Sequence, residues 1–128
     1  MQKIILDTNF LLIPSQFKVD IFSEIERICH FKYKLFVLDK SISELKNIIA
    51  NKKGKTKTQA KIALELVRFK RTPIMRTQGN KLVDDYIVEM CKKGNYIVAT
   101  QDTPLKKRLK PYKTKIISLR QKKYLILR

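Results

Sequence analysis

The chain has 128 residues, 44% of them hydrophobic, and its 29 Lys and Arg against 11 Asp and Glu set a formal net charge of +18. This length fits one domain over residues 1–128, and the composition excludes a disordered chain. No apolar run reaches the roughly 18 residues of a membrane span, so no membrane partner is expected. The charge favours nucleic acid, because binding to phosphates releases counterions.

Short apolar runs alternate with helical patterns along the chain. Strands are expected at Lys3–Leu6, Leu35–Leu38, Pro73–Met75, Tyr96–Thr100 and Thr114–Leu119, with Tyr124–Leu127 as an extra edge strand. Helices are expected from Asp20 to about Cys29 and at Ser41–Asn51, Thr58–Phe69, Lys81–Lys93 and Thr103–Lys110, with Pro14 ending an apolar patch at Phe10–Ile13. This alternation predicts an α/β sandwich around a mostly parallel sheet.

The first apolar run ends abruptly in Asp7, Thr8 and Asn9. A run without alternation suits a strand buried on both faces, and ligands bind beyond the carboxyl ends of such strands. The second half of the chain repeats the pattern, since Tyr96–Thr100 leads into Gln101 and Asp102. Asp7 and Asp102 are therefore the strongest candidates for a site. Each could instead cap the helix that follows it.

Two further acids have alternatives that the sequence leaves open. Ser41 to Glu44 fits a capping box, in which the glutamate bonds back to the start of its helix. Asp84 and Asp85 stand in the first turn of a helix, where the macrodipole favours acids. Adjacent helical residues point about 100° apart, so one of the two faces a common site. Asp84 is favoured because it borders the apolar face.

Several acids converging from different elements suit a hard divalent cation, which takes one or two protein carboxylates and completes its shell with water and phosphate. Such an ion activates water and stabilises a leaving group. The single histidine, His30, has no ligand pattern around it, and Gly54, Gly79 and Gly94 form no phosphate loop. Cys29 and Cys91 lack metal-ligand spacing, which favours reduced core residues in a cytoplasmic protein.

The chain resembles the PIN-domain endoribonucleases through Ile5–Asn9, Ile42–Leu45, Asp84–Val88 and Val98–Asp102, which look like the four acid motifs of that family in order. Gln16–Glu24, Lys106–Leu109 and Ile117–Lys122 look like an archaeal subgroup. That subgroup is similar to the eukaryotic PIN nuclease of small-subunit ribosomal RNA processing and less like VapC-type toxins. The family often has another acid two residues after the fourth, where this chain has Pro104.

The resemblance implies a three-layer α/β/α sandwich with about five strands and Mg²⁺- or Mn²⁺-dependent hydrolysis of RNA, with a ribosomal RNA precursor as one substrate. It implies that Asp7 and Asp102 are primary metal ligands and that Asp84 and Glu44 hold metal-bound waters or a second ion. Asn9 and Thr100 would orient ligands and phosphate. The resemblance also supports a role for Glu44 in the site over its alternative role in a capping box.

Two basic segments flank elements that carry these acids. They comprise Lys52, Lys53, Lys55 and Lys57, in an expected loop, and Lys106, Lys107 and Arg108. We expect them to contact RNA; the alternative is an ordinary solvated lysine surface. Two other functions stay open, a non-catalytic RNA-binding or ribosome assembly factor and a VapC-type toxin ribonuclease. The oligomeric state is also open, with a homodimer as one option.

Overall fold

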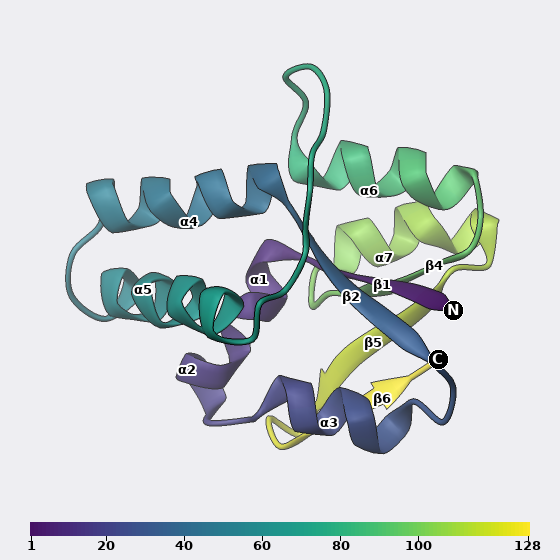
Figure 1. Ribbon diagram of the computed structural model, residues 1–128, viewed down its shortest axis with the longest axis horizontal. Helices are drawn as coiled ribbons and strands as arrows, with labels where there is room; N and C mark the ends of the chain where they lie inside the picture. Colours follow the sequence, from purple (N-terminus) through teal and green to yellow (C-terminus); the bar gives the residue numbers. More distant parts are fainter.

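A computed structural model describes residues 1–128 as a six-stranded sheet with helices on both faces (Figure 1). The strands are β1 (Gln2–Leu6), β2 (Tyr33–Leu38), β3 (Ile74–Met75), β4 (Tyr96–Ala99), β5 (Lys115–Arg120) and β6 (Tyr124–Leu127). The helices are α1 (Thr8–Leu11), α2 (Ile13–Phe17), α3 (Ile21–Ile28), α4 (Asp39–Asn51), α5 (Gly54–Phe69), α6 (Val83–Lys92) and α7 (Thr103–Leu109), before a 3-10 turn at Lys110–Tyr112. The predicted α/β/α sandwich is confirmed.

The strand order is β3-β2-β1-β4-β5-β6, and every neighbouring pair is parallel except β5 and β6. The sheet has six strands because the last apolar run adds the antiparallel edge strand β6. The central strands β1 and β4 pair in a register that sets Leu6 beside Ala99. The residues that follow them, Asp7 and Thr100, therefore emerge side by side at the carboxyl edge of the sheet.

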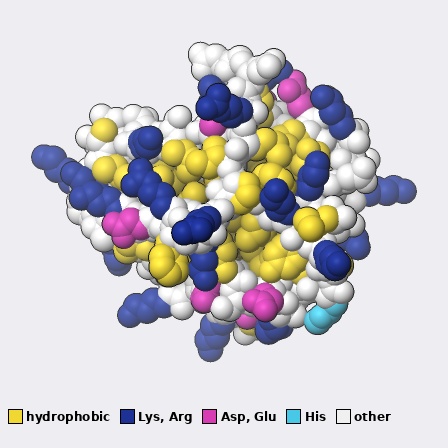
Figure 2. All heavy atoms as spheres, viewed as in Figure 1, with side chains coloured by type: hydrophobic (Ala, Val, Ile, Leu, Met, Phe, Trp, Pro, Cys, Tyr) yellow, Lys and Arg dark blue, Asp and Glu magenta, His cyan; other side chains and the backbone are white.

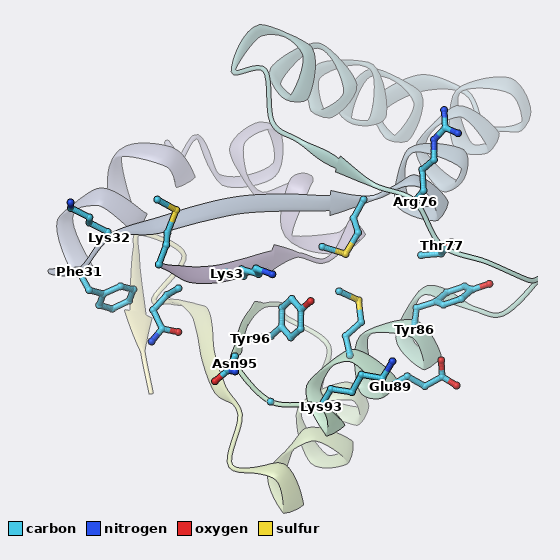
Figure 3. Close-up of a pocket in the computed structure, with 15 residues that line it drawn as sticks. Lys3, Phe31, Lys32, Arg76, Thr77, Tyr86, Glu89, Lys93, Asn95 and Tyr96 are labelled. Atoms are coloured by element: carbon cyan, nitrogen blue, oxygen red, sulfur yellow. The ribbon is translucent and has the colours of Figure 1, made fainter.

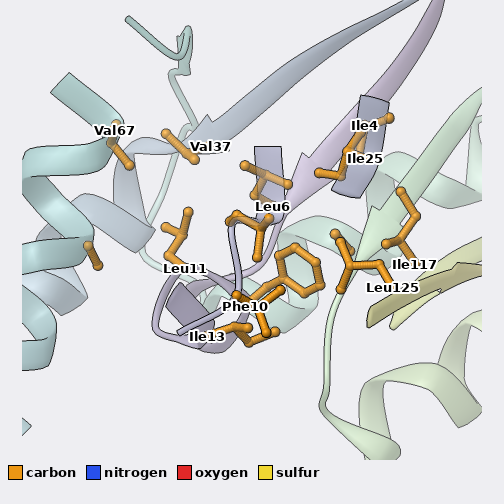
Figure 4. Packing of buried hydrophobic residues seen from close by; sticks show 14 of the residues in the cluster. Ile4, Leu6, Phe10, Leu11, Ile13, Ile25, Val37, Val67, Ile117 and Leu125 are labelled. Carbon is orange, nitrogen blue, oxygen red and sulfur yellow. The ribbon is translucent and has the colours of Figure 1, made fainter. Parts of the chain in front are cut away.

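Both faces of the central strands are buried, as their unbroken apolar runs predict. Ile4 and Leu6 of β1 pack with Phe10 and Ile13 in a core that includes residues of α3 and α5 (Figure 4). Ile5, the residue between them, packs on the opposite face against α6 and α7. Strand β1 is therefore packed between two hydrophobic cores, and Asp7 directly follows its last residue.

Two helices begin earlier than the sequence predicts. Helix α4 starts at Asp39 instead of Ser41, and α5 starts at Gly54 instead of Thr58. Gly54 has a φ of 66°, a left-handed conformation that glycine adopts without strain, so two residues suffice to join the helices. The expected basic loop is therefore short: Lys55 and Lys57 lie on α5.

Pro14 does not end the segment in which it lies. It occupies the first turn of α2, where the missing backbone N–H removes no helical hydrogen bond. The predicted cap at Asp20 is confirmed, because its carboxylate accepts hydrogen bonds from the N–H groups of Phe22 and Ser23. None of the helices combines the length and the apolar character that crossing a bilayer requires.

Candidate active site

Asp7 is buried at the carboxyl edge of the sheet, with 4% of its surface exposed. One carboxylate oxygen accepts a hydrogen bond from Thr8 N–H at 2.8 Å, so the predicted capping of the next helix is present. The other accepts from the Thr100 hydroxyl at 2.6 Å. Burial raises the pKa of Asp7, although the two hydrogen bonds act to lower it. The negative charge of Asp102 raises the pKa further. The capping and site roles therefore coexist.

Asp102 stands at the N-cap position of α7, but its side chain makes no capping hydrogen bond. Its carboxyl lies close to that of Asp84, which reaches the same place from the first turn of α6, and the two groups interact electrostatically. Burial raises the pKa of Asp84 to about 6, with contributions from the charges of Asp7 and Asp102. The structure thus brings three carboxyls from three elements into electrostatic contact.

Glu44 does not form the capping box that its spacing suggested. Helix α4 has Leu38 at its N-cap position, and no side chain caps it. The Thr8 hydroxyl instead lies 2.8 Å from Glu44 Oε1 and 2.8 Å from the Ser41 hydroxyl. Because a hydroxyl has one proton, Thr8 donates to the carboxylate and accepts from Ser41. Burial raises the pKa of Glu44, and the charge of Asp7 adds to this effect.

These four acids lack ion-pair partners in a chain that is rich in cations. The salt bridges of the structure join Glu24 to Arg27, Glu89 to Lys81 and Asp85 to Arg108. Partly buried carboxyls without a cationic partner repel one another, which is the condition that a bound cation relieves. Asp85, in contrast to Asp84, points to an exposed arginine.

The donor set consists of oxygen atoms, which suits Mg²⁺ or Mn²⁺. No three His, Cys, Asp or Glu side chains stand close enough to form a complete cage for an ion. Mg²⁺ does not need such a cage, because it keeps several waters and takes one or two carboxylates with substrate phosphates. The open cluster therefore fits the predicted cofactor, with Asp7 and Asp102 as the groups that would hold it.

A polar network holds the edge on which the acids stand. Asn9 Oδ1 accepts a hydrogen bond from Gln101 N–H at 3.3 Å and lies 3.5 Å from the Thr100 hydroxyl. Gln101 in turn accepts from Leu119 N–H at 2.7 Å, which ties the edge to β5. Sequence reasoning missed Ser41, Gln101 and the Thr8 contact. Their partners lie far along the chain, so the only signal was their polarity beside buried strand ends.

A cavity of about 570 Å³ opens beside the acids, with Glu44 and Asp84 in its wall. Lys40 and Lys81 also line it, so an anionic ligand would meet both cations and carboxylates there. The predicted basic segments lie outside this cavity. Lys52 follows Glu44 by eight residues along α4, a distance of about 12 Å at the helical rise.

The second basic segment lies on α7, the helix that Asp102 precedes. Lys107 and Arg108 are exposed, whereas Lys106 is half-buried, and burial lowers its pKa. Arg108 already bonds Asp85 at 2.9 Å. The three cations of this segment therefore differ in their availability to RNA, and Lys107 is the one that is both exposed and without a salt bridge.

Carboxylates gather at the carboxyl edge of a mostly parallel sheet, and neither a histidine nor a phosphate-binding loop lies among them. These features define a class of three-layer α/β/α proteins whose functional site is built from acidic side chains. The chain belongs to the PIN like domain family, whose profile matches residues 4–122.

Three proteins illustrate the likeness. Ribonuclease VapC4 of Methanocaldococcus jannaschii is 32% identical over 97% of this chain and 95% of its own length. The structure of the PIN domain endonuclease Utp24 has a TM-score of 0.81 and 25% identity, over 98% of this chain and 90% of that one. A domain of a functionally unknown protein from M. jannaschii shares the fold, with a TM-score of 0.62 and 16% identity over 94% and 92% of the two chains.

Proposed function

We propose that this protein is a metal-dependent endoribonuclease that hydrolyses phosphodiester bonds in single-stranded or looped RNA. The observation that carries this proposal is the convergence of Asp7, Asp84 and Asp102, with Glu44 beside them, unpaired in a chain of net charge +18. A purely RNA-binding protein would gain nothing from this cluster, because carboxylates repel phosphate unless a cation lies between them. The names of its relatives, a ribonuclease and an endonuclease, support the same activity.

Each residue has a role that its contacts support. Asp7, fixed by bonds to both of its oxygens, and Asp102 would hold the ion, while Asp84 and Glu44, in the wall of the cavity, would accept hydrogen bonds from water. When bound, Mg²⁺ or Mn²⁺ activates water and neutralises negative charge that develops on the phosphate. Thr100 keeps Asp7 oriented, as outer-shell hydroxyls commonly do for metal ligands.

The RNA that this site would cleave is proposed from two relatives. The motifs at Gln16–Glu24 and Ile117–Lys122, which look like the archaeal subgroup related to a ribosomal RNA-processing nuclease, support a role in processing a ribosomal RNA precursor, and the likeness to the endonuclease Utp24 supports internal cleavage. The identity of 32% to Ribonuclease VapC4 supports the second candidate, a toxin ribonuclease. Expression in a bacterial host separates them, because a toxin stops growth whereas a processing enzyme specific for a precursor leaves it unchanged.

The test of the function is cleavage of end-labelled single-stranded RNA by the purified protein. We expect internal cuts with Mg²⁺ or Mn²⁺, loss of cutting in chelator, and recovery when the ion is restored in excess. Cutting that persists in chelator would contradict the proposal, as would binding without any cutting. The matched inactive variant for this assay is Asp7→Asn.

A second prediction concerns Glu44 and the hydroxyl that holds it. Both Glu44→Gln and Thr8→Val should lower kcat about 10- to 100-fold, the usual effect of losing a supporting partner at a metal site. The melting temperature should change little for Glu44→Gln, since no helix cap depends on it. Glu65→Gln, an exposed acid on α5, is the control. Wild-type turnover in Glu44→Gln would remove Glu44 from the site.

A third prediction concerns the basic turn between α4 and α5. Neutralising Lys52, Lys53 and Lys55 to Gln should weaken binding of unrelated single-stranded RNAs to a similar degree, because lysine contacts to phosphate read no sequence. The slope of log affinity against log salt should fall by about two, at roughly 0.7 per contact. Turnover at saturating RNA should be unchanged.

The control for this prediction neutralises three exposed cations elsewhere, namely Lys110, Lys115 and Arg128. This variant has the same net charge as the first. If the two variants lose salt dependence equally, the turn is an ordinary solvated surface.

A further inference from the structure

A groove of about 880 Å³ runs between the sheet and α6, beyond the acid cluster (Figure 3). Figure 3 shows Tyr96 near its middle with Lys3 beside it, Phe31 and Lys32 at one end, and Thr77 at the other. This groove contains none of the four candidate acids. It therefore has no role in the chemistry described above.

The groove exists because α6 and α7 cover only part of their face of the sheet. In the core on this side, the strands contribute Ile5, Val98 and Leu38, the last residue of β2. Lys34 and Phe36 point to the same face as Leu38, since side chains alternate along a strand, yet neither joins that core. The middle of β2 is thus a sheet surface without a helix over it.

Two partly buried aromatic rings on this surface have lysine ammonium groups over them: Tyr96, which borders the core on this side, and Phe36, which does not join it. The ammonium of Lys3 lies 5.8 Å from the centre of the Tyr96 ring, its neighbour across β1 and β4. The ammonium of Lys34 lies 5.4 Å from the centre of the Phe36 ring. Aromatic rings that reach the surface of a sheet are sites on which unpaired bases stack, and the adjacent cations suit phosphates.

The positive charge of the groove favours an anionic binding partner over a second copy of this chain. Its walls contain the cations Lys3, Lys32, Arg76 and Lys93. The one acid in its walls, Glu89, is already paired with Lys81. Figure 2 shows hydrophobic side chains at the centre of the viewed face with Lys and Arg around them. A second copy of this chain would present the same positive surface and be repelled, whereas a polyanion with flat apolar bases fits both features.

One end of the groove is tied to the helix that carries Glu44. The Thr77 hydroxyl donates to Asp39 at 2.7 Å, and Thr77 N–H donates to the same carboxylate at 3.2 Å. Asp39 is the first residue of α4, and Glu44 lies little more than one turn further on. A strand of RNA leaving the acid edge would reach the groove by passing this contact.

We propose that the groove and the open surface of β2 bind single-stranded RNA, with bases stacked on Tyr96 and Phe36 and phosphates paired with the adjacent lysines. The proposal rests on the proposed function, because the RNA held here is the same molecule that the acids cleave. It adds that the substrate is unpaired over several nucleotides beyond the cut. Base pairing would hide the faces that stack.

The test measures fluorescence anisotropy of a labelled 12-nucleotide single-stranded RNA in chelator, where no cleavage occurs. Phe36→Leu and Tyr96→Leu should each weaken binding about 5- to 150-fold, the loss of one stacked base. Tyr96→Phe, which keeps the ring, should bind as the wild type does. The matched control is Phe22→Leu, a half-buried ring on α3 with the ammonium of Lys70 at 5.3 Å.

Wild-type affinity in both leucine variants would overturn the proposal, as would an equal loss in Phe22→Leu. A wild-type dimer that Phe36→Leu converts to a monomer in sedimentation would overturn it in favour of a second copy. Cleavage with Mn²⁺ is scored separately. If the wild type cleaves but the leucine variants bind normally, the groove proposal alone fails. If ring-dependent binding occurs without cleavage, the groove proposal stands and the proposed nuclease function fails.

Discussion

Asp7→Asn should abolish metal-dependent RNA cleavage, with a loss of about 100-fold or more, and leave the fold intact. Removing one ligand of a catalytic ion costs several kcal/mol of transition-state stabilisation, and each 1.4 kcal/mol is a factor of ten in rate. Asn9 and Thr100 remain in place to hold the edge of the sheet. The measurement is kcat/KM on single-stranded RNA with saturating Mn²⁺.

Thermal stability separates this outcome from simple unfolding. Burial raises the pKa of Asp7, so its ionised form is less favourable in the folded protein than in the unfolded chain. An asparagine amide keeps the bond from Thr8 N–H and donates to the Thr100 hydroxyl, which rotates to accept it. The metal-free variant should therefore melt at the same temperature as the wild type or higher. Full cleavage by a stably folded Asp7→Asn would refute the nuclease assignment.

The sequence predicts best where a local pattern decides the structure. The unbroken apolar run before Asp7 predicts a strand buried on both faces, and Ile4 and Ile5 face opposite cores. Position on a helix likewise distinguishes Asp84 from Asp85, because one borders the buried stripe of α6 and the other does not. Parallel pairing then places Asp7 and Asp102 at one edge without any information about distant contacts.

The local sequence pattern gives a wrong prediction where a residue far along the chain determines the structure. Ser41 to Glu44 has the spacing of a capping box, but the helix begins at Asp39, whose carboxylate binds Thr77 from another part of the chain. The contact between Thr8 and Glu44 spans 36 positions, so no spacing rule anticipates it. The groove is also hidden from the sequence, since the exposure of Phe36 depends on how far α6 extends over the sheet.

Asp84→Asn and Asp85→Asn form a matched pair at adjacent positions with the same chemical change. Asp84→Asn should lower kcat at least tenfold, because its carboxyl lies within the electrostatic reach of Asp102 and Asp7 at the candidate site. Asp85→Asn should leave cleavage near the wild-type rate. It breaks only an exposed ion pair to Arg108, an interaction that contributes about 0–1 kcal/mol to stability.

The melting temperature should rise in Asp84→Asn and stay the same or fall slightly in Asp85→Asn. Burial and the neighbouring carboxyls raise the pKa of Asp84 to about 6, so at neutral pH its ionised form destabilises the metal-free fold, and asparagine removes that repulsion. Asp85→Asn should bring no comparable gain in stability, because the Asp85 side chain is 43% exposed and already paired with a cation. Excess Mn²⁺ should raise the melting temperature of the wild type and of Asp85→Asn more than that of Asp84→Asn, since a ligand stabilises the state that binds it. A reversed pattern, with Asp85→Asn inactive and Asp84→Asn active, would make Asp85 the third acid of the site.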